Sequence, residues 1–490
     1  MTARFPTGPS KTVPESAPAT KLESNALGLL STSALTAAYM GPALSIYCLF
    51  GPMAEKVGSG VGFVMFLGLL MTLPSAISFG MLAREMPSAG GVYAWARAAL
   101  GESIGLWIGL TAASYYIVCV IFPPIVFGQY FNDLLQQCGL PANVWTWLIG
   151  VIALLLVTGS VTYRGIVVSS ELALTMLLIE SAVVVALAGT FIGLAAAHGT
   201  FTWAPLTFSG CKGGWSSVFL VLPMVMLSMA CDGATPAAEE TRNARRTIPL
   251  AVVLTCTIVG LWYVVGYSAF ALAVPPADAG ILTSQAYASA VTPLAGQAWG
   301  SLKVLVAITA MTAATGAAIP GAIAASRVLF AMSRDGKLPG RFSRLHPRFR
   351  SPWNALHIVY GATLLAVLPA LIYGPNRGID FWAGISGWYI AIVYVSVNVA
   401  SIVFLWRFHR ARFHVVWNLL VPLIGIAAQV LIIWQSIIVE LWNSGTLGHC
   451  AQGLIVLVSV ITAVYVGVHR MRRGSEPSPA EPAYSVDAQA

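Results

Sequence analysis

Two acidic residues of this sequence stand in strongly apolar surroundings. Asp232 follows the apolar run 218–230 and is itself followed by Gly233 and Pro236, two residue types that break helices. Glu180 has long apolar runs on both sides and no basic residue nearby in the sequence. An ionised carboxylate at mid-bilayer costs about 2.5–3.5 kcal/mol even on the lenient insertion scale. If these runs cross a membrane, each acid is expected to face a polar cavity, pair with a cation or carry a proton.

Each acid also has a purely structural interpretation. Asp232 would then lie at the cytoplasmic end of its segment and cap the short stretch that begins at Gly233. Glu180 would be a permanently protonated acid, hydrogen-bonded to a neighbouring hydroxyl. In the functional interpretation, Glu180 is a candidate for reversible protonation during a transport cycle. The sequence leaves both pairs of alternatives open.

The composition indicates that these runs do cross a membrane. Of the 490 residues, 57% are hydrophobic and only 9% are charged, whereas a soluble domain carries about 25% charged residues. Several apolar runs reach about 20 residues, enough to cross roughly 30 Å of hydrocarbon as a helix, and they lack the alternation of barrel strands. The predicted fold is an all-α integral membrane protein with twelve transmembrane helices, near residues 27–51, 61–83, 97–128, 145–163, 172–196, 216–236, 249–274, 299–332, 354–373, 380–406, 414–440 and 451–469.

The basic residues predict the orientation of these spans. If the N-terminus is internal, the 26 Lys and Arg residues fall on the side of the termini except for Lys56, Lys212, Lys303 and Arg377. Because basic residues near span ends stay cytoplasmic, both termini are expected inside. The polar segments 1–25 and 471–490 are expected to be disordered cytoplasmic tails, and the first is not a cleaved signal peptide. The net charge of +8 therefore reflects topology, and we expect no nucleic-acid partner.

Several kinds of chemistry are disfavoured by what the sequence lacks. The seven cysteines are scattered without a CxxC pair, and the seven histidines are dispersed without an HExxH motif. We therefore expect no metal site and no cofactor. There is no GxxxxGK[ST] motif for ATP binding. Transport would have to be driven by an ion or substrate gradient.

Helix-breaking residues occur in two corresponding spans. Gly41 and Pro42 lie together inside the first span, and Gly233 and Pro236 fall in the sixth. These spans occupy equivalent places if two five-helix halves in inverted orientation are followed by two extra helices. Broken helices in equivalent positions point to a transporter site, where freed amides attract an anion and freed carbonyls a cation. A zwitterion would fit such a site, although a packing kink is the simpler interpretation of the first break.

Three segments resemble the amino acid–polyamine–organocation superfamily of amino acid permeases. Residues 85–110, "EMPSAGGVYAWARAALGESIGLWIGL", match its P-x-A-G-G-x-Y motif, and residues 326–356 match its R-x-x-x-A-M-[SA]-R-D-G-x-L-P segment. Residues 228–249 match its pattern G-[FY]-[DE]…E-E-x-x-N-P-x-R-x-I-P, with Cys231 in place of a frequent aromatic and Ala244 in place of the usual proline. The resemblance implies a permease domain over 26–470, with repeats near 27–196 and 216–406 and extra helices near 414–469.

The resemblance also implies where the substrate and the coupling ion bind. In some relatives a lysine in span five lies near the sodium position of sodium-coupled cousins, and Glu180 falls there in this sequence. A glutamate would carry a proton or attract a cationic group instead. The expected substrate-binding residues are Gly41, Pro42, Ala43 and Ser45 at the first break and Ala230, Cys231, Asp232 and Gly233 at the second; the expected coupling residues are Glu180, Asp232, Thr312 and Thr315.

Other polar residues inside the spans have two interpretations each. Tyr115 and Tyr116 either line the cavity or pack at the membrane interface, and the second is favoured. Thr309, Thr312 and Thr315 repeat every three residues along span eight. Their hydroxyls would bind a substrate or ion, or the small side chains would let helices pack closely.

The function favoured by these observations is secondary active transport of an amino acid or a related amine across the plasma membrane by alternating access. Two buried acids without a basic partner tilt the substrate towards cationic amino acids or polyamines. Proton coupling is expected, with exchange as the alternative, and the expected partners are the substrate, a proton and membrane lipid. A membrane-embedded enzyme would need a clustered nucleophile, base or metal site, which the sequence lacks, and a non-transporting sensor stays a third class. The exact substrate, the direction of transport and the oligomeric state stay open.

Overall fold

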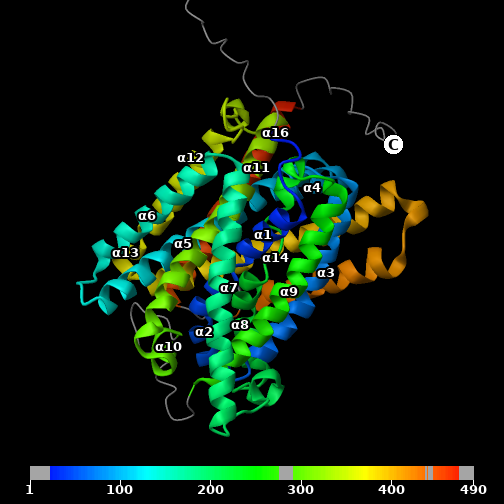
Figure 1. The fold of residues 1–490 in the computed structure, drawn as a ribbon. Coiled ribbons are helices and arrows are strands. Elements are labelled where there is room, and N and C mark those ends of the chain that lie inside the picture. Colours follow the sequence, from blue (N-terminus) through cyan, green and yellow to red (C-terminus); the bar gives the residue numbers. More distant parts are fainter. Residues whose placement is uncertain (1–21, 275–290, 436–438, 440–444, 474–490) are drawn as a thin grey trace, which may run out of the picture.

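The fold is a bundle of long helices (Figure 1). The computed structural model describes residues 22–274, 291–435, 439 and 445–473. Within these ranges there are no strands, and β-type pairing is limited to two isolated bridges, Leu27 with Thr241 and Gly58 with Cys211. The predicted all-α class is confirmed.

Eleven helical spans in the described ranges are long and apolar enough to cross a bilayer. The sixth predicted span corresponds to the shorter apolar helix α8, Trp215–Ser228. The count of twelve membrane crossings and the inverted repeat stay predictions. The helices of the eleven spans are α1 (Leu29–Met40) with α2 (Pro42–Val57), α3 (Val61–Glu85), α5 (Glu102–Gln137), α6 (Val144–Tyr163), α7 (Ile166–Ala197), α9 (Ala244–Leu272), α10 (Val291–Trp299) with α11 (Val304–Arg334), α12 (Trp353–Val367) with α13 (Ala370–Tyr373), α14 (Pro375–Phe408), the π-helical turn Val416–Leu420 with α15 (Val421–Ile433), and α16 (Gly445–Arg473).

The first span is interrupted where the sequence predicts it. Gly41 has φ 63° and ψ 66°, the left-handed conformation that glycine adopts without steric cost. Its N–H bonds to the carbonyls of Ala37 and Ala38, which ends α1. Pro42 then starts α2, where its missing N–H leaves no helical hydrogen bond unmade. A glycine followed by a proline thus makes one span into two helices.

The sixth span is interrupted more widely. Helix α8 has 14 residues, which at about 1.5 Å per residue is shorter than the hydrocarbon core. Residues 229–234 after it are not helical, and the chain continues as the short 3₁₀ helix η3, Thr235–Glu240. The polypeptide therefore passes the level of Asp232 as an unwound segment, defined here as residues 229–234.

The third span begins later than the sequence predicts. The predicted range starts at residue 97, but the structure has a separate short helix, α4 (Val92–Leu100), and starts α5 at Glu102. Gly101 between them has φ 94°, which L side chains rarely adopt. A Cβ at Gly105 would lie 2.5 Å from the Arg97 Cα, so two glycines allow α4 to fold back closely onto α5.

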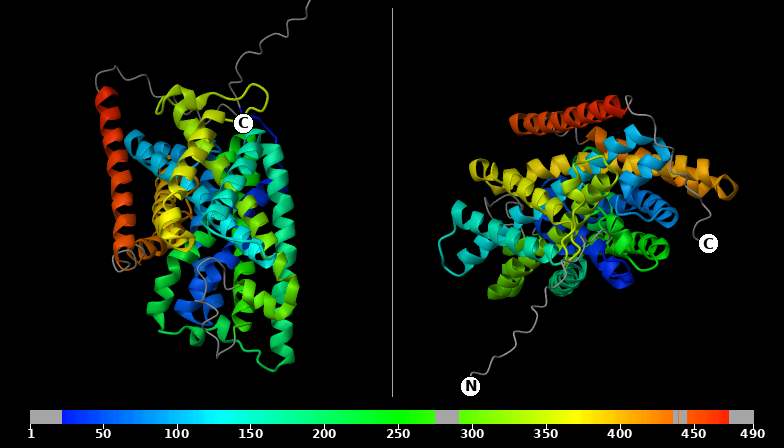
Figure 2. Two further views of the ribbon diagram at one scale, coloured as in Figure 1. Left: turned by 90° about the vertical axis from the view of Figure 1, so that its left-hand side faces the viewer. Right: turned by 90° about the horizontal axis from the view of Figure 1, so that it is seen from above.

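Helices α5 and α11 form the centre of the bundle and pack along each other. Helices α3 and α9 pack along each other just as extensively. Helix α1 packs on α7, α9 and α11. Helix α16 lies at the outer edge of the bundle beside α5 and α14 (Figure 2, red). The two interrupted spans are thus enclosed by continuous helices, which positions their breaks in the interior.

Candidate substrate site at the two helix breaks

Asp232 lies in the unwound segment, where three tyrosine hydroxyls surround its carboxylate. The residue is 0% exposed. Oδ1 accepts hydrogen bonds from Tyr115 at 2.8 Å and Tyr394 at 3.1 Å, and Oδ2 accepts one from Tyr116 at 2.7 Å. Tyr115 and Tyr116 belong to α5 and Tyr394 to α14. In the described part of the chain, Asp232 forms no ion pair, so neutral hydrogen-bond donors and not a positive charge offset the cost of its burial.

These contacts correct two interpretations from the sequence. Tyr115 and Tyr116 are both 0% exposed and bind Asp232, so their favoured placement at the membrane interface is wrong. The capping interpretation of Asp232 is wrong too, because η3 starts without a side-chain cap. Tyr394 was missed, since it lies 162 residues further along the chain and nothing local marks it. An adjacent Tyr-Tyr pair inside an apolar span was the signal available for the other two.

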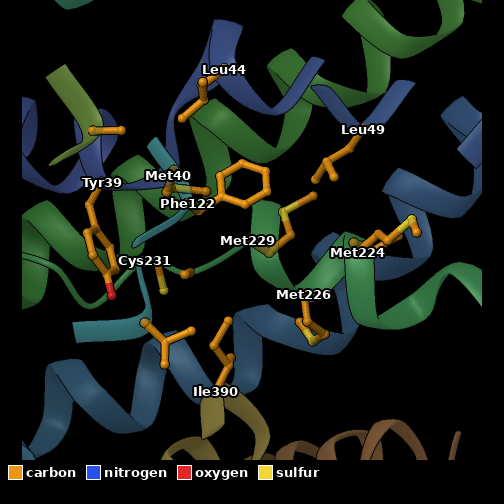
Figure 3. Close-up of a cluster of buried hydrophobic side chains, with 14 of the residues drawn as sticks. Tyr39, Met40, Leu44, Leu49, Phe122, Met224, Met226, Met229, Cys231 and Ile390 are labelled. Carbon is orange, nitrogen blue, oxygen red and sulfur yellow. The ribbon is translucent and has the colours of Figure 1, made fainter. Parts of the chain in front are cut away.

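The two breaks lie against each other. The Cys231 N–H donates to the Tyr394 hydroxyl at 2.9 Å, and Ala230 is 2% exposed. A Cβ at Gly233 would lie only 2.4 Å from Cγ of Tyr39, the second-last residue of α1. Figure 3 shows Tyr39 and Cys231 in one cluster of buried side chains. Residues of both predicted breaks therefore meet in one place.

At the first break, a carbonyl freed by the interruption is occupied by hydroxyls. The Met40 carbonyl accepts hydrogen bonds from Tyr263 at 2.7 Å and from Ser45 Oγ at 3.1 Å. Ser45 is one of the expected site residues, whereas Ala43, 0% exposed, packs in the hydrophobic core. Tyr263 on α9 was not singled out from the sequence, because only the fold places it beside α1.

Glu180 is buried beside this first break. It is 2% exposed, and its Oε2 has no hydrogen-bond partner among the residues that the structure describes. Tyr47 and Tyr263 lie within electrostatic range of its carboxyl.

The other two expected coupling residues, Thr312 and Thr315, donate to carbonyls of their own helix, those of Thr309 at 2.9 Å and Met311 at 2.8 Å. The structure thus brings Glu180 to the break but gives the two threonines local bonds.

Two ion pairs connect η3 to α11 at the end of the bundle where the basic residues collect. Arg327 donates from Nε and Nη2 to both oxygens of Glu240, at 3.0 and 3.1 Å, and both side chains are 1% exposed. Arg334 binds Glu239 in the same two-pronged way at 2.8 and 2.9 Å. Burial favours a higher pKa for Glu239, but hydrogen bonds from Arg334 and the Ala89 amide outweigh it and lower the pKa. Glu240 is therefore buried in an ion pair and is not solvated.

The start of α1 is attached to the same network. The Leu27 N–H donates to the Glu240 carbonyl at 2.9 Å, and the Arg242 N–H donates to the Leu27 carbonyl at 2.8 Å. Arg242 Nε also donates to the carbonyl of Asn25 at 2.7 Å. The segment before α1, η3 and α11 are therefore held together at the end of the bundle where α1 begins.

Comparison with known proteins identifies the family. A family model described as amino acid permease matches residues 27–465. The chain belongs to the amino acid permease family. The permease is 27% identical over 342 residues to the branched-chain amino acid permease BcaP of Bacillus subtilis, a match that covers 67% of this chain and 70% of the relative. It is 24% identical over 374 residues to the low-affinity putrescine importer PlaP of Escherichia coli, covering 74% and 78%. The methylthioribose transporter of Bacillus subtilis is 23% identical over 324 residues, covering 63% and 67%.

Membership confirms the resemblance inferred from the three motif segments. The permease is a multi-pass membrane transporter, because its family and these relatives are transporters and the described chain has eleven apolar spans. The same finding decides against the membrane-embedded enzyme.

Replacing Gly233 by alanine is expected to destabilise the permease and lower its uptake together. The new methyl would come within 2.4–2.7 Å of the Tyr39 Cγ, Cβ and Cδ1 atoms. Because the Tyr39 Cβ is attached directly to the backbone of α1, it cannot move away unless the helix moves too. Overpacking of this kind costs about 1–3 kcal/mol. Thermal unfolding in detergent measures the effect, with Gly193→Ala in α7 as control because its added Cβ would meet nothing within 4 Å. Unfolding of Gly233→Ala at the wild-type temperature would show that close approach of the breaks is not required.

Proposed function

We propose that the permease is a secondary active transporter that moves an amino acid or a related amine across the plasma membrane by alternating access. The observation that supports this is Asp232, an acid with 0% exposure in an unwound segment that has hydroxyl donors but no ion-pair partner within the described ranges. A substrate ammonium would supply the missing positive charge. Two relatives are named for branched-chain amino acids and for putrescine, and all of these compounds carry an ammonium group.

In this proposal, substrate binds between the two breaks. The first break contributes Gly41, Pro42, Ala43 and Ser45, and the second contributes Ala230, Cys231, Asp232 and Gly233. Asp232 binds the ammonium, while a carboxylate, if the substrate has one, faces the amides freed at the start of α2. The unwound segment lets both groups approach backbone atoms that a continuous helix would keep bonded.

Alternating access then requires the cytoplasmic end to open. The ion pairs Glu239–Arg334 and Glu240–Arg327 join η3 to α11, and η3 is continuous with the unwound segment. Movement of η3 away from α11 would break both pairs and open a path from Asp232 to the cytosol. Both termini are proposed to be cytoplasmic, in line with the basic residues at this end.

Uptake into proteoliposomes tests the function. Purified full-length permease is reconstituted and supplied with radiolabelled leucine, arginine or putrescine, with and without an inward proton gradient. Concentrative uptake driven by the gradient supports proton symport, whereas uptake only into vesicles preloaded with unlabelled substrate supports exchange. Binding of a probe without movement in either mode would favour a sensor.

Glu180 is proposed to carry the coupling proton, together with the Asp232 site. Its carboxyl is buried beside the first break and one oxygen has no hydrogen-bond partner in the described chain, so its protonation state can change without breaking an existing bond at that atom. Thr312 and Thr315 are proposed to line the path from α11.

The Glu180→Gln variant is expected to exchange substrate but to lose the pH dependence of net uptake. Glutamine keeps the size of the side chain and cannot bind or release a proton. Uptake between pH 5 and 8 and counterflow at one pH measure the two activities. Glu171→Gln is the matched control, because Glu171 is on the same helix but exposed. A wild-type pH profile in Glu180→Gln would remove the proton-carrier role.

A further inference from the structure

Tyr39, at the end of α1, has a hydroxyl without a hydrogen-bond partner in the described part of the chain. Its side chain is 8% exposed, and the oxygen is fully covered. The polar group beside it is the Cys119 thiol, which is a weak donor and acceptor. A covered hydroxyl with only a thiol beside it is poorly satisfied, and native proteins contain few buried hydroxyls of this kind. The placement of this hydroxyl therefore needs a reason other than folding.

The surroundings of Tyr39 connect it to both breaks. Its ring covers Gly233, as the 2.4 Å approach of a Cβ there shows. Its ring also meets those of Tyr115 and Tyr116, with centroids 6.3 and 6.2 Å apart. These are the tyrosines that bind Asp232. In Figure 3 the Tyr39 side chain extends towards Cys231 in the unwound segment.

Hydrogen-bond accounting at Asp232 suggests what the free hydroxyl is for. A carboxylate offers about four acceptor positions, and an ammonium group has three donors and no acceptor. Three positions of Asp232 are taken by tyrosine hydroxyls, which leaves about one for an ammonium group. The remaining ammonium donors need other acceptors nearby, and the Tyr39 oxygen accepts no hydrogen bond within 3.5 Å from an N–H or O–H group of the described residues.

We infer that the Tyr39 hydroxyl is a direct ligand of the substrate and accepts a hydrogen bond from its ammonium group next to Asp232. The inference rests on the proposed function and adds a requirement to it. The site should select ammonium groups that carry N–H donors, because both Asp232 and Tyr39 act there as acceptors. A quaternary ammonium has the charge but no donor, so it should bind poorly.

The Tyr39→Phe variant of the full-length permease tests the inference in the uptake assay with leucine and putrescine. We expect KM to rise about tenfold or more for the transported probe, since one hydrogen bond to a charged group is lost. The Tm should stay the same or rise, because an unsatisfied hydroxyl is removed. Ser401→Ala is the matched control. The Ser401 hydroxyl, in α14, is also buried and has no hydrogen-bond partner among the described residues, and its loss should leave KM unchanged.

The outcomes separate this inference from the function on which it rests. If wild-type permease transports a probe and Tyr39→Phe keeps the wild-type KM, the hydroxyl is not a ligand and the function stands. If no probe binds or moves, both are overturned. Should Tyr39→Phe fail to fold, the wild-type protein still decides: N,N,N-trimethylleucine that competes as well as leucine would exclude hydrogen bonding to the ammonium.

Discussion

The Asp232→Asn variant is expected to lose at least about a hundredfold in uptake while its abundance in the membrane stays near that of the wild type. The variant removes the charge that is proposed to bind the substrate ammonium, and charge-assisted bonds of this kind contribute about 1.5–3 kcal/mol each. Folding should survive, because tyrosine hydroxyls rotate and can accept from the new amide as well as donate to its oxygen. Initial uptake rates per folded protein, with folded protein quantified by size-exclusion fluorescence, measure the effect.

Asp133→Asn provides the control for the loss of a buried acid. Asp133 is 6% exposed and accepts a hydrogen bond from Thr292 at 2.9 Å, away from the breaks. Its amide variant should transport normally. If Asp232→Asn loses folded protein in proportion to uptake, Asp232 belongs to the fold and its role at the site is refuted.

The second large effect is expected at the buried ion pair. Glu240→Gln leaves the Arg327 guanidinium uncompensated at 1% exposure, and removing one partner of such a pair destabilises by about 3–5 kcal/mol. Denaturant or SDS titration of the purified permease measures the change in the free energy of unfolding. The neighbouring pair gives the matched comparison: Arg334 and Glu239 are 42% and 28% exposed, so Glu239→Gln should cost less than about 1 kcal/mol.

A double variant distinguishes the effect of leaving a buried charge unpaired from the effect of changing the packing. Glu240→Leu combined with Arg327→Met removes both charges at similar volume and should recover much of the stability, since apolar replacements of buried pairs are often neutral or stabilising. Equal stability of Glu240→Gln and the wild type would mean that water reaches this pair and that the pair does not hold η3 against α11.

The sequence was sufficient to predict the breaks and the acid between them. A glycine followed by proline interrupts a helix through local backbone chemistry, and the interruption appears at Gly41 as expected. A carboxylate in an apolar run requires a polar environment wherever the helices pack. Asp232 was therefore found from its neighbours in the chain, and the structure supplies the partners that meet the requirement.

The partners themselves could not be predicted, because hydropathy shows that a span exists but not which side of it faces which neighbour. Tyr394 and Tyr263 reach the breaks from α14 and α9, far away in sequence. Glu240 has several arginines within a few residues, yet it pairs with Arg327, 87 positions away. The sequence pattern also could not separate Thr312, which bonds to its own helix, from a hydroxyl that is free to bind an ion.

The backbone bonds through Leu27 have a mechanical consequence. They join the segment before α1 to η3 and the residues after it through one strand-like bridge, to which Arg242 Nε adds a hydrogen bond to the Asn25 carbonyl. In the proposed transport cycle, these bonds would make the segment before α1 and η3 move together. If the proposed alternating access is correct, separation of η3 from α11 and rearrangement of the residues around Asp232 would be one coupled movement, which would limit leakage of solute through the permease.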